Sequence, residues 1–236
     1  MKQLDKLRKK IDLIDAKILD LFNKRSKIAI DIGKEKKSNN LFRPERQANI
    51  LKALFKHKNN NISPEVILSY WRNIFLSQID LQGGIELIIL SKKSDDIFKS
   101  IYDYFSHDVK IIIEKKIENA IKKVHLKKNR FLVLPYPGST KFNNWWVNFK
   151  FEKTFVIATL PFLAKKGKKP NYIILSKYFP MLEKDCCNLY ISEKKIDKYD
   201  LIIEAKYKDV FFYKSYKKNN DRNLKCIGGY PKQYEK

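Results

Sequence analysis

The apolar residues near the start of the chain recur at steps of three and four. They are Leu4, Leu7, Ile11, Ile14, Ile18, Leu21, Ile28 and Ile32. Because this spacing places side chains on one face of a helix, it predicts an amphipathic helix. The first proline is Pro44 and the only earlier glycine is Gly33. We therefore expect one helix from about residue 4 to about residue 37, about 50 Å long.

Two shorter helices are predicted after the polar stretch 37–40. The second opens at Pro44, a residue favoured at the first helical position, and carries Gln47, Ile50, Leu51 and Leu54 on one face. After a loop at 58–61, Ser63-Pro64-Glu65 predicts the capped start of a third helix, which Gly83-Gly84 ends. Its inner stripe is Val66, Ile67, Tyr70, Trp71, Ile74, Gln78 and Leu81. Two short helices cannot cover the long stripe, so we expect a dimer that pairs two long helices.

From Ile85 the pattern changes to short β-rich runs. They are 85–90, 109–113, 131–134, 155–160, 172–175, 189–191, 201–204 and 210–213. Helical stretches at 96–105 and 118–126 separate the first three runs, an alternation typical of an α/β domain. The sequence thus predicts an all-α domain at 1–82 and an α/β domain of small strands at 85–236, with Gly83-Gly84 as the boundary.

The charge balance is strongly basic, at +24, but it indicates no nucleic-acid partner. Lysine accounts for 43 of the 50 basic residues, and they are spread along the chain without an arginine-rich tract or a nucleic-acid motif. We expect a solvated lysine surface. No stretch of about 18 apolar residues is present, and no signal peptide is recognisable, so no membrane partner is expected.

The cysteines and histidines indicate neither a metal site nor a disulfide framework. Cys186, Cys187 and Cys226 are an odd, low count, and the three histidines are scattered. We therefore expect no metal and no His-based triad. The thiols suit a reducing compartment, and we expect a cytoplasmic protein.

Arginine is rare, and its positions are informative. Five of the seven arginines lie in the first 82 residues, and Arg25 occupies the apolar stripe between Leu21 and Ile28. Lys36 lies 11 residues further, which is three turns plus about 20°, so it shares the face of Arg25. Arg8 is about 100° away by the same geometry and should face a different neighbour.

Other polar residues fall on or beside the inner faces of the two shorter helices. Gln78 and Gln82 lie on the third helix, and Arg46 and Gln47 lie beside Ile50 on the second. Each alone could be a snorkelling or register-setting residue. Together they predict a bound anion, because burying cations without anions costs several kcal/mol.

These residues resemble the all-helical class of chorismate mutases. The resemblance lies in the stretches 7–15, 21–25 and 32–36, in Arg43-Pro44-Glu45-Arg46-Gln47, and in Trp71-Arg72 through Gln82. It implies a three-helix, intertwined dimer that rearranges chorismate to prephenate in aromatic amino-acid biosynthesis, without cofactor or metal. It also implies that Arg25 and Arg46 hold substrate carboxylates, that Arg8 arrives from the partner chain, and that Lys36 and Gln82 bind the breaking ether oxygen.

Two positions, Gln47 and Gln78, depart from the family pattern. Gln47 stands where the family usually has a glutamate that contacts the substrate hydroxyl, which implies weakened rather than abolished activity. Gln78 replaces a small hydroxyl residue, and Arg43 stands where some members carry an acid. Gln82 is an amide, so activity should not require acidic pH.

The remaining residues resemble the C-terminal extension of some proteobacterial mutases, through Trp145-Trp146, Leu160-Pro161-Phe162 and Ile227-Gly228-Gly229-Tyr230. A degenerate prephenate dehydratase-like domain is one interpretation, since Arg130–Leu134 is similar to a dehydratase string. However, if the string aligns with the one near the catalytic threonine of a dehydratase, Asn129 stands in place of that threonine. If it aligns with an earlier dehydratase strand, Tyr136-Pro137-Gly138 stands in place of Glu-Asn-Ser. No chemistry is assigned to this domain, and Trp145-Trp146 is expected in a core or an interface.

Two other functions stay open from the sequence. One is isochorismate pyruvate lyase, which has the same helical fold. The other is a binding or regulatory protein with a vestigial site, for which Gln47 is the best sequence argument.

Overall fold

A computed structural model of the chain describes residues 2–35, 40–58, 61–90, 95–138, 145–182, 184–205, 209–217, 219 and 221–235. Three helices open it: α1 (Lys2–Glu35), α2 (Pro44–Phe55) and α3 (Pro64–Asp80). Pro44 is the first residue of α2, and the Ser63 side chain accepts a hydrogen bond from the Val66 backbone N–H at the start of α3. The three predicted helices are therefore confirmed, with Pro44 at the start of α2 and Ser63 as the N-cap of α3, as the sequence predicts.

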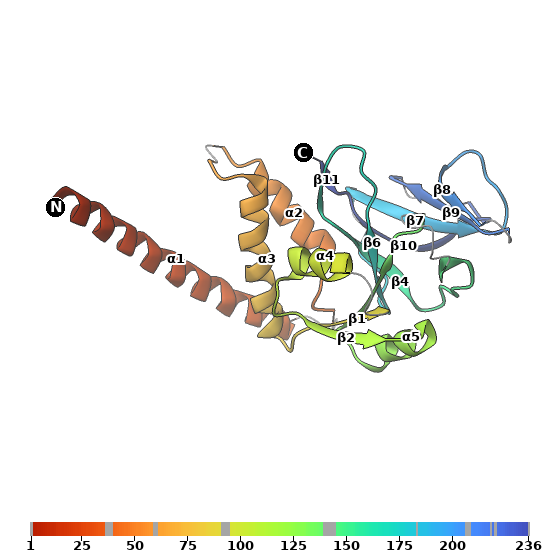
Figure 1. Ribbon diagram of the computed structural model, residues 1–236, viewed down its shortest axis with the longest axis horizontal. Helices are drawn as coiled ribbons and strands as arrows, with labels where there is room; N and C mark the ends of the chain where they lie inside the picture. Colours follow the sequence, from red (N-terminus) through yellow and green to blue (C-terminus); the bar gives the residue numbers. More distant parts are fainter. Residues whose placement is uncertain are drawn as a thin grey trace.

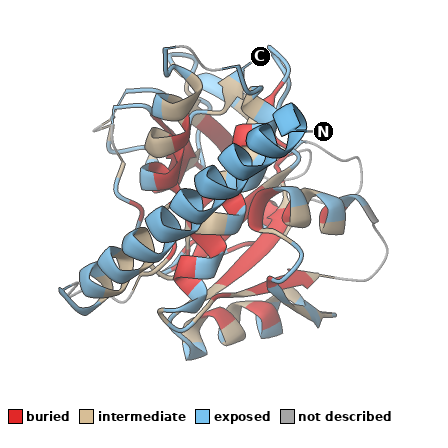
Figure 2. Ribbon diagram, turned by 90° about the vertical axis from the view of Figure 1, so that its left-hand side faces the viewer, coloured by how far each residue is buried: buried red, intermediate tan, exposed pale blue. Residues whose placement is uncertain are grey.

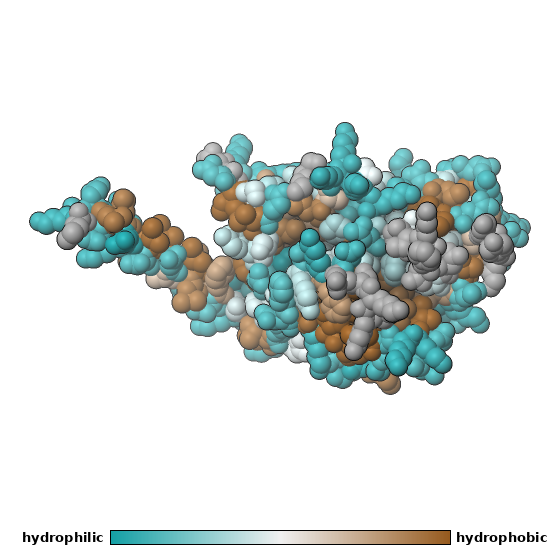
Figure 3. Space-filling model, viewed as in Figure 1, coloured by the Kyte–Doolittle hydropathy of each residue, from teal (hydrophilic) through white to brown (hydrophobic). Residues whose placement is uncertain are grey.

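Helix α1 projects away from the rest of the molecule (Figure 1). None of its residues is buried, and Figure 2 shows it without a buried position along its length. Eleven large apolar side chains of α1 are 41–64% exposed, and Figure 3 shows them as brown patches along the helix. Because water disfavours a continuous apolar stripe of this length, a single chain leaves α1 incompletely packed.

The sheet begins with parallel strands and ends with antiparallel ones. Strand β1 (Glu86–Leu90) pairs in parallel with β2 (Lys110–Glu114) and β3 (Arg130–Pro135), and helices α4 (Asp95–Phe105) and α5 (Ile117–Leu126) connect them. The other strands of the main sheet are β4 (Phe155–Leu160), β6 (Tyr172–Ser176), β7 (Cys186–Ser192), β8 (Asp200–Glu204), β9 (Phe211–Ser215) and β10 (Lys225–Pro231). The order is β2-β1-β3-β6-β4-β10-β7-β9-β8, and β5 (Leu163–Ala164) pairs separately with β11 (Tyr234–Glu235).

The alternation of helices and strands therefore holds only as far as β3. Beyond it the described residues form strands, turns and one short 3-10 helix (Trp145–Val147), and the strand pairs are mostly antiparallel. All eight predicted strands are present, with ends shifted by up to a few residues. Trp146, at 2% exposed, packs edge-on against Phe212, so the prediction of a core position is confirmed for it.

Strand β10 was not predicted, because its sequence is unfavourable for a strand. It contains Gly228-Gly229 and ends at Pro231, and glycine and proline both weaken strands. Gly228 lies at a β-bulge with φ +114°, and a Cβ there would be 2.2 Å from the Val156 carbonyl oxygen. Only glycine fits this close approach of two backbones, so its presence marks a tertiary contact rather than a loop.

The helices and the sheet share one hydrophobic core. Leu51 of α2 and Phe75 of α3 belong to the same buried cluster as Leu87 of β1 and Phe131 of β3. The alternate residues of the strands, such as Ile88, face a second cluster on the other side of the sheet, under α5. The Gly83-Gly84 junction thus separates two patterns of secondary structure that pack into a common interior.

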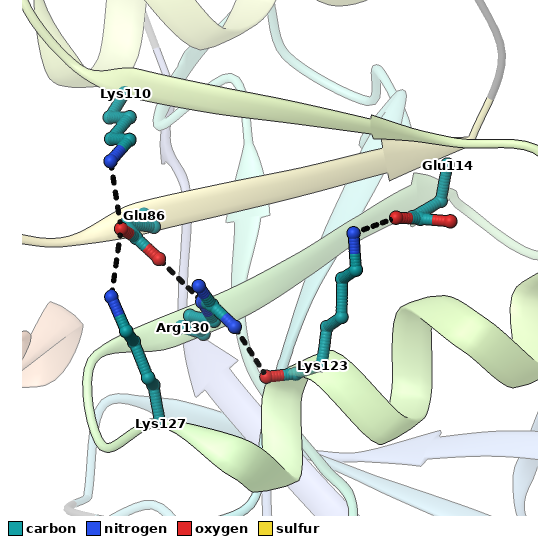
Figure 4. Close-up of polar contacts among 6 residues, drawn as sticks. All are labelled: Glu86, Lys110, Glu114, Lys123, Lys127 and Arg130. Atoms are coloured by element: carbon teal, nitrogen blue, oxygen red, sulfur yellow. Dashed lines mark hydrogen bonds and ion pairs between the residues drawn. The ribbon is translucent and has the colours of Figure 1, made fainter.

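An ion cluster ties together the starts of the three parallel strands (Figure 4). Glu86 of β1 accepts from Arg130 Nε on β3, and Lys110 Nζ on β2 lies 3.1 Å from it. Lys127 Nζ lies 3.4 Å from the same carboxylate. Burial alone would raise the pKa of Glu86, but these cations, Arg130 foremost, lower it to about 2.

Candidate functional site

The centre of the candidate site is the contact of α1 with α3. Arg25, half-buried on α1, donates from Nη1 to Oε1 of Gln78, which is 6% exposed on α3. The Arg25 guanidinium carbon lies 5.7 Å from the centroid of the Phe75 ring. Arg25 interrupts the apolar stripe where α1 crosses α3, so the two predicted site residues do come together.

Arg46 brings a second cation to this point. It is exposed in the first turn of α2, and it is close enough that its charge, together with the larger effect of burial, lowers the pKa of Arg25. A lowered pKa means that the charged form is disfavoured by its surroundings. The positive charge of Arg46 near Arg25 therefore favours the binding of an anion beside them.

Gln82 lies beside these residues at the end of α3. Its Nε2 donates to the Gln78 backbone oxygen across 3.0 Å. A Cβ on Gly33 would stand 2.8 Å from Gln82 Oε1, so the glycine lets the Gln82 amide rest against α1. Lys36, predicted to share this site, lies outside the described residues.

Gln47 is buried at 8% exposed, and its partner is a residue that the sequence analysis did not single out. Arg72 Nη1 donates to Gln47 Oε1 across 2.7 Å. Arg72 is itself 3% exposed, and its guanidinium carbon lies 3.6 Å from the centroid of the Tyr104 ring. Burial lowers the pKa of Arg72, an effect that Tyr104 partly offsets. An arginine between Trp71 and the apolar Ile74-Phe75 of α3 was the available signal.

The structure does not bring Arg8 to this site within one chain. It lies near the exposed end of α1, with Nη1 3.8 Å from the Asp5 carboxylate. Its direction away from the chain's own site agrees with the helix geometry, whereas its arrival from a partner stays a prediction.

Arg43 is engaged elsewhere. Its Nε donates to Glu45 across 2.6 Å and its Nη2 to the Met181 sulfur across 3.0 Å. A structural role therefore accounts for Arg43, which stands where some members of the family carry an acid.

The site as a whole is cationic and rich in amide donors. Arg25, Arg46, Gln78 and Gln82 come from three helices, and among the described residues their contacts are with cations, amides and an aromatic ring. Arginine forks bind carboxylates in bidentate fashion, and an amide N–H can donate to a neutral or developing negative oxygen. The arrangement suits a small molecule with two carboxylates, and nothing in it requires a metal or a cofactor.

Comparison with known proteins points to the same region. Residues 7–83 match the family model for chorismate mutase type II. Three relatives are described as bifunctional chorismate mutase/prephenate dehydratases. The chain is 25% identical to the one from Neisseria gonorrhoeae over 134 residues (57% of this chain, 37% of the relative), 28% identical to that from Aquifex aeolicus over 141 residues (57% and 39%), and 25% identical to that from Pseudomonas aeruginosa over 146 residues (59% and 40%).

The chain thus matches only about two fifths of the length of these relatives, 37–40%. A matched stretch of 134 residues is longer than the helical segment, so the similarity reaches into the sheet. The comparison with solved structures found two partial matches, both with low sequence identity. A prephenate dehydratase from Streptococcus mutans has a TM-score of 0.42 at 14% identity, covering 63% of this chain and 98% of that one. GqqA, a quorum quenching acylase, has a TM-score of 0.44 at 7% identity, covering 62% and 94%.

The family match falls on the segment that carries the candidate site. All of the candidate residues, from Arg8 to Gln82, lie within residues 7–83. The N-terminal helical region of this chain is therefore a chorismate mutase type II domain, and a larger sheet-rich domain follows it.

Proposed function

We propose that the chain is a chorismate mutase, which rearranges chorismate to prephenate in aromatic amino-acid biosynthesis. The observation that supports the proposal is the hydrogen bond from Arg25 to Gln78, close to the positive charge of Arg46. All three residues lie within the segment that matches the family model. The bifunctional relatives carry the same activity in their names.

In the proposed mechanism, Arg25 and Arg46 hold the two carboxylates of chorismate. Binding the flexible dicarboxylate in its compact reactive shape lowers the entropic part of the barrier. As the ether bond breaks, negative charge develops on its oxygen. Gln82 and Lys36 donate to that oxygen and so stabilise the transition state more than the substrate. Gln78 orients Arg25, and Gln47 contacts the substrate hydroxyl.

The proposal includes a homodimer. Helix α1 has no buried residue, and its apolar stripe extends beyond the parts of α2 and α3 that one chain provides. A second copy would cover the stripe in an isologous pairing, in which each Arg8 reaches the other chain's Arg25 and Arg46.

We also propose the domain division at 1–82 and 85–236, with catalysis in the first part. The three cysteines form no disulfide among the described residues, which fits a cytoplasmic location. No helix in the described part of the chain has both the length and the apolar character needed to cross a membrane. The described residues hold no cluster of potential metal ligands.

The test is the loss of chorismate's ultraviolet absorbance with purified protein, followed by identification of the product. Prephenate is the expected product. Pyruvate from isochorismate would instead identify a lyase, and phenylpyruvate would add a dehydratase in the sheet domain. No turnover by a folded dimer would contradict the proposal and favour a binding or regulatory protein.

Salt separates the small-molecule site from a polyanion-binding surface. Binding of nucleic acid weakens steeply with ionic strength because counterions are released. A half-buried site for a dicarboxylate responds less. Turnover that persists at raised salt supports the enzyme.

A further inference from the structure

A hollow of about 370 Å³ lies outside the proposed mutase site, where α3 meets α4 and the segment after β4. We call it the Arg72 hollow. Its lining includes Arg72 from α3, Tyr102 and Tyr104 from α4, and Phe162 after β4. The residues that line it include none of Arg25, Arg46, Gln78 and Gln82. The helical and sheet-rich parts of the chain thus form its walls together.

Arg72 has no acidic partner in this wall among the described residues, although Tyr104 offsets part of the effect of burial on its pKa. It is 3% exposed, and its guanidinium carbon lies 3.6 Å from the centroid of the Tyr104 ring and 5.6 Å from that of Phe162. Nη1 donates to the neutral amide of Gln47, whereas Nε and Nη2 are buried without a hydrogen-bond partner among the described residues. Native structures rarely leave buried donors in this state, which points to a missing group.

The missing group carries negative charge. Burying a cation without an anion costs several kcal/mol, and the faces of Tyr104 and Phe162 offset only part of that. The two unpaired nitrogens form part of a planar fork, whose matching partner is a carboxylate.

The rest of the lining favours an aromatic ligand. The Tyr102 ring stacks on His107, with centroids 4.7 Å apart and planes 16° apart, and Tyr104 and Phe162 add two more rings. The carboxylates of Glu65 and Asp103 also line the hollow, but both residues are exposed, where water and salt screen their repulsion of an anion. The volume lies at the small end of the range for ligand sites, about 300–1,000 Å³.

We propose that the Arg72 hollow binds a small aromatic carboxylate, with the carboxylate on Arg72 and the ring against Tyr102, Tyr104 and Phe162. The bound carboxylate would accept hydrogen bonds from the same Arg72 guanidinium that donates to Gln47. The ligand therefore alters how Gln47 meets the substrate, and it links the sheet-rich part of the chain to turnover. This second part rests on the proposed mutase function.

The binding test is calorimetric titration of the full chain with 3-phenylpropanoate. Binding with a dissociation constant of about 1 mM or tighter is expected. The alcohol 3-phenylpropanol, which lacks the charge, and 3-cyclohexylpropanoate, which lacks the flat ring, should each bind roughly tenfold more weakly. Equal binding of all three would overturn the proposal.

Two variants locate the ligand. Arg72→Met keeps an unbranched side chain in place of the arginine stem and removes the charged guanidinium, so binding should be lost. Because that variant changes a buried residue, Ser69→Phe provides a second test, since Ser69 is exposed on α3 and lines the hollow. Ser77→Phe, on an exposed position of the same helix outside the hollow, is the matched control and should bind as the unchanged chain does.

The link to turnover is tested separately with chorismate. 3-Phenylpropanoate should change the rate of the unchanged chain and leave that of Ser69→Phe unaffected. Inhibition that survives Ser69→Phe would place the compound in the mutase site and overturn the proposal. Binding without any chorismate turnover would leave the hollow's ligand established and refute the mutase function, whereas turnover without binding would do the reverse.

Discussion

Arg72 and Gln47 form a buried pair in which the guanidinium donates to the amide oxygen across 2.7 Å. The hydrogen-bond partner of the cation is neutral, because Gln47 stands where chorismate mutases of the all-helical class usually have glutamate. Arg72 is held in turn by Tyr104, a residue of the sheet-rich part. The side chain proposed to meet the substrate hydroxyl is thus positioned through a contact between the two parts of the chain.

Gln47→Glu should stabilise the fold, because it gives Arg72 a carboxylate. Charge-assisted hydrogen bonds contribute about 1.5–3 kcal/mol, so the free energy of unfolding in urea should rise by about 1 kcal/mol or more. Chorismate turnover should also increase. The same change in an Arg72→Met background should destabilise the chain, since the new carboxylate would then be buried alone. A gain that persists without Arg72 would contradict the pairing.

Arg25→Ala should lower kcat/KM for chorismate by about 100-fold or more, because it removes a cation from the proposed carboxylate site. Lys24→Ala is the control, since Lys24 is an exposed neighbour on α1 that pairs with Asp20 at 2.8 Å. Steady-state kinetics of both variants give the comparison. Equal kinetics of Arg25→Ala and the unchanged chain would show that the site is misassigned.

A mixture of Arg8→Ala and Arg25→Ala chains should recover activity that neither has alone. If Arg8 crosses between chains, each mixed dimer holds one intact site and one doubly altered site. At equal mixing, about one quarter of the unchanged activity should return. Subunit exchange is confirmed with labelled chains, and no recovery after exchange would argue against a shared site.

Gln82→Glu should make turnover dependent on pH. The Gln82 amide donates over the whole accessible pH range, so the unchanged chain should show little loss of kcat/KM between about pH 6 and pH 8. A glutamate donates only when protonated, so the variant should lose activity as the pH rises through its pKa. A steep loss in the unchanged chain over that range would remove Gln82 from the proposed role.

The free energy of unfolding should decrease at acidic pH because of Glu86. Its pKa in the fold is about 2, below its value of about 4.5 in the unfolded chain, so the stabilisation is complete above the higher value and is lost as the pH falls towards the lower one. The contribution should be about 2 kcal/mol, since Lys110 and Lys127 are mostly exposed. Glu86→Gln should therefore reduce the difference between the free energies of unfolding measured in urea at neutral and at acidic pH. Glu118→Gln, at an exposed position of α5, should leave it unchanged.

Local signals predicted the helices and several contacts of the site. Pro44 and Ser63-Pro64 set the starts of α2 and α3, and the interruption of the stripe by Arg25 marked where α1 meets Gln78. Such signals lie within a few turns of the chain. The order of the strands, and the return of β10 beside β4, depend on contacts between distant residues and were not predicted.

Arg72 shows the same limit within the candidate site. Its place on α3 was visible in the sequence, but its partners come from α2, α4 and the segment after β4. No spacing rule connects Gln47, Tyr104 and Phe162. The sequence analysis therefore identified the residues proposed to touch the substrate and missed the buried residue behind one of them.

The common interior on both sides of Gly83-Gly84 bears on how such a chain can change over generations. A segment with its own core can be cut out, duplicated or fused to new neighbours as a unit. Here Leu51 and Phe75 are buried in the same cluster as Leu87 and Phe131. Separating the chain at the two glycines would therefore expose apolar core residues of both parts to water. Substitutions in this shared cluster on either side of the junction should therefore affect the packing of both parts.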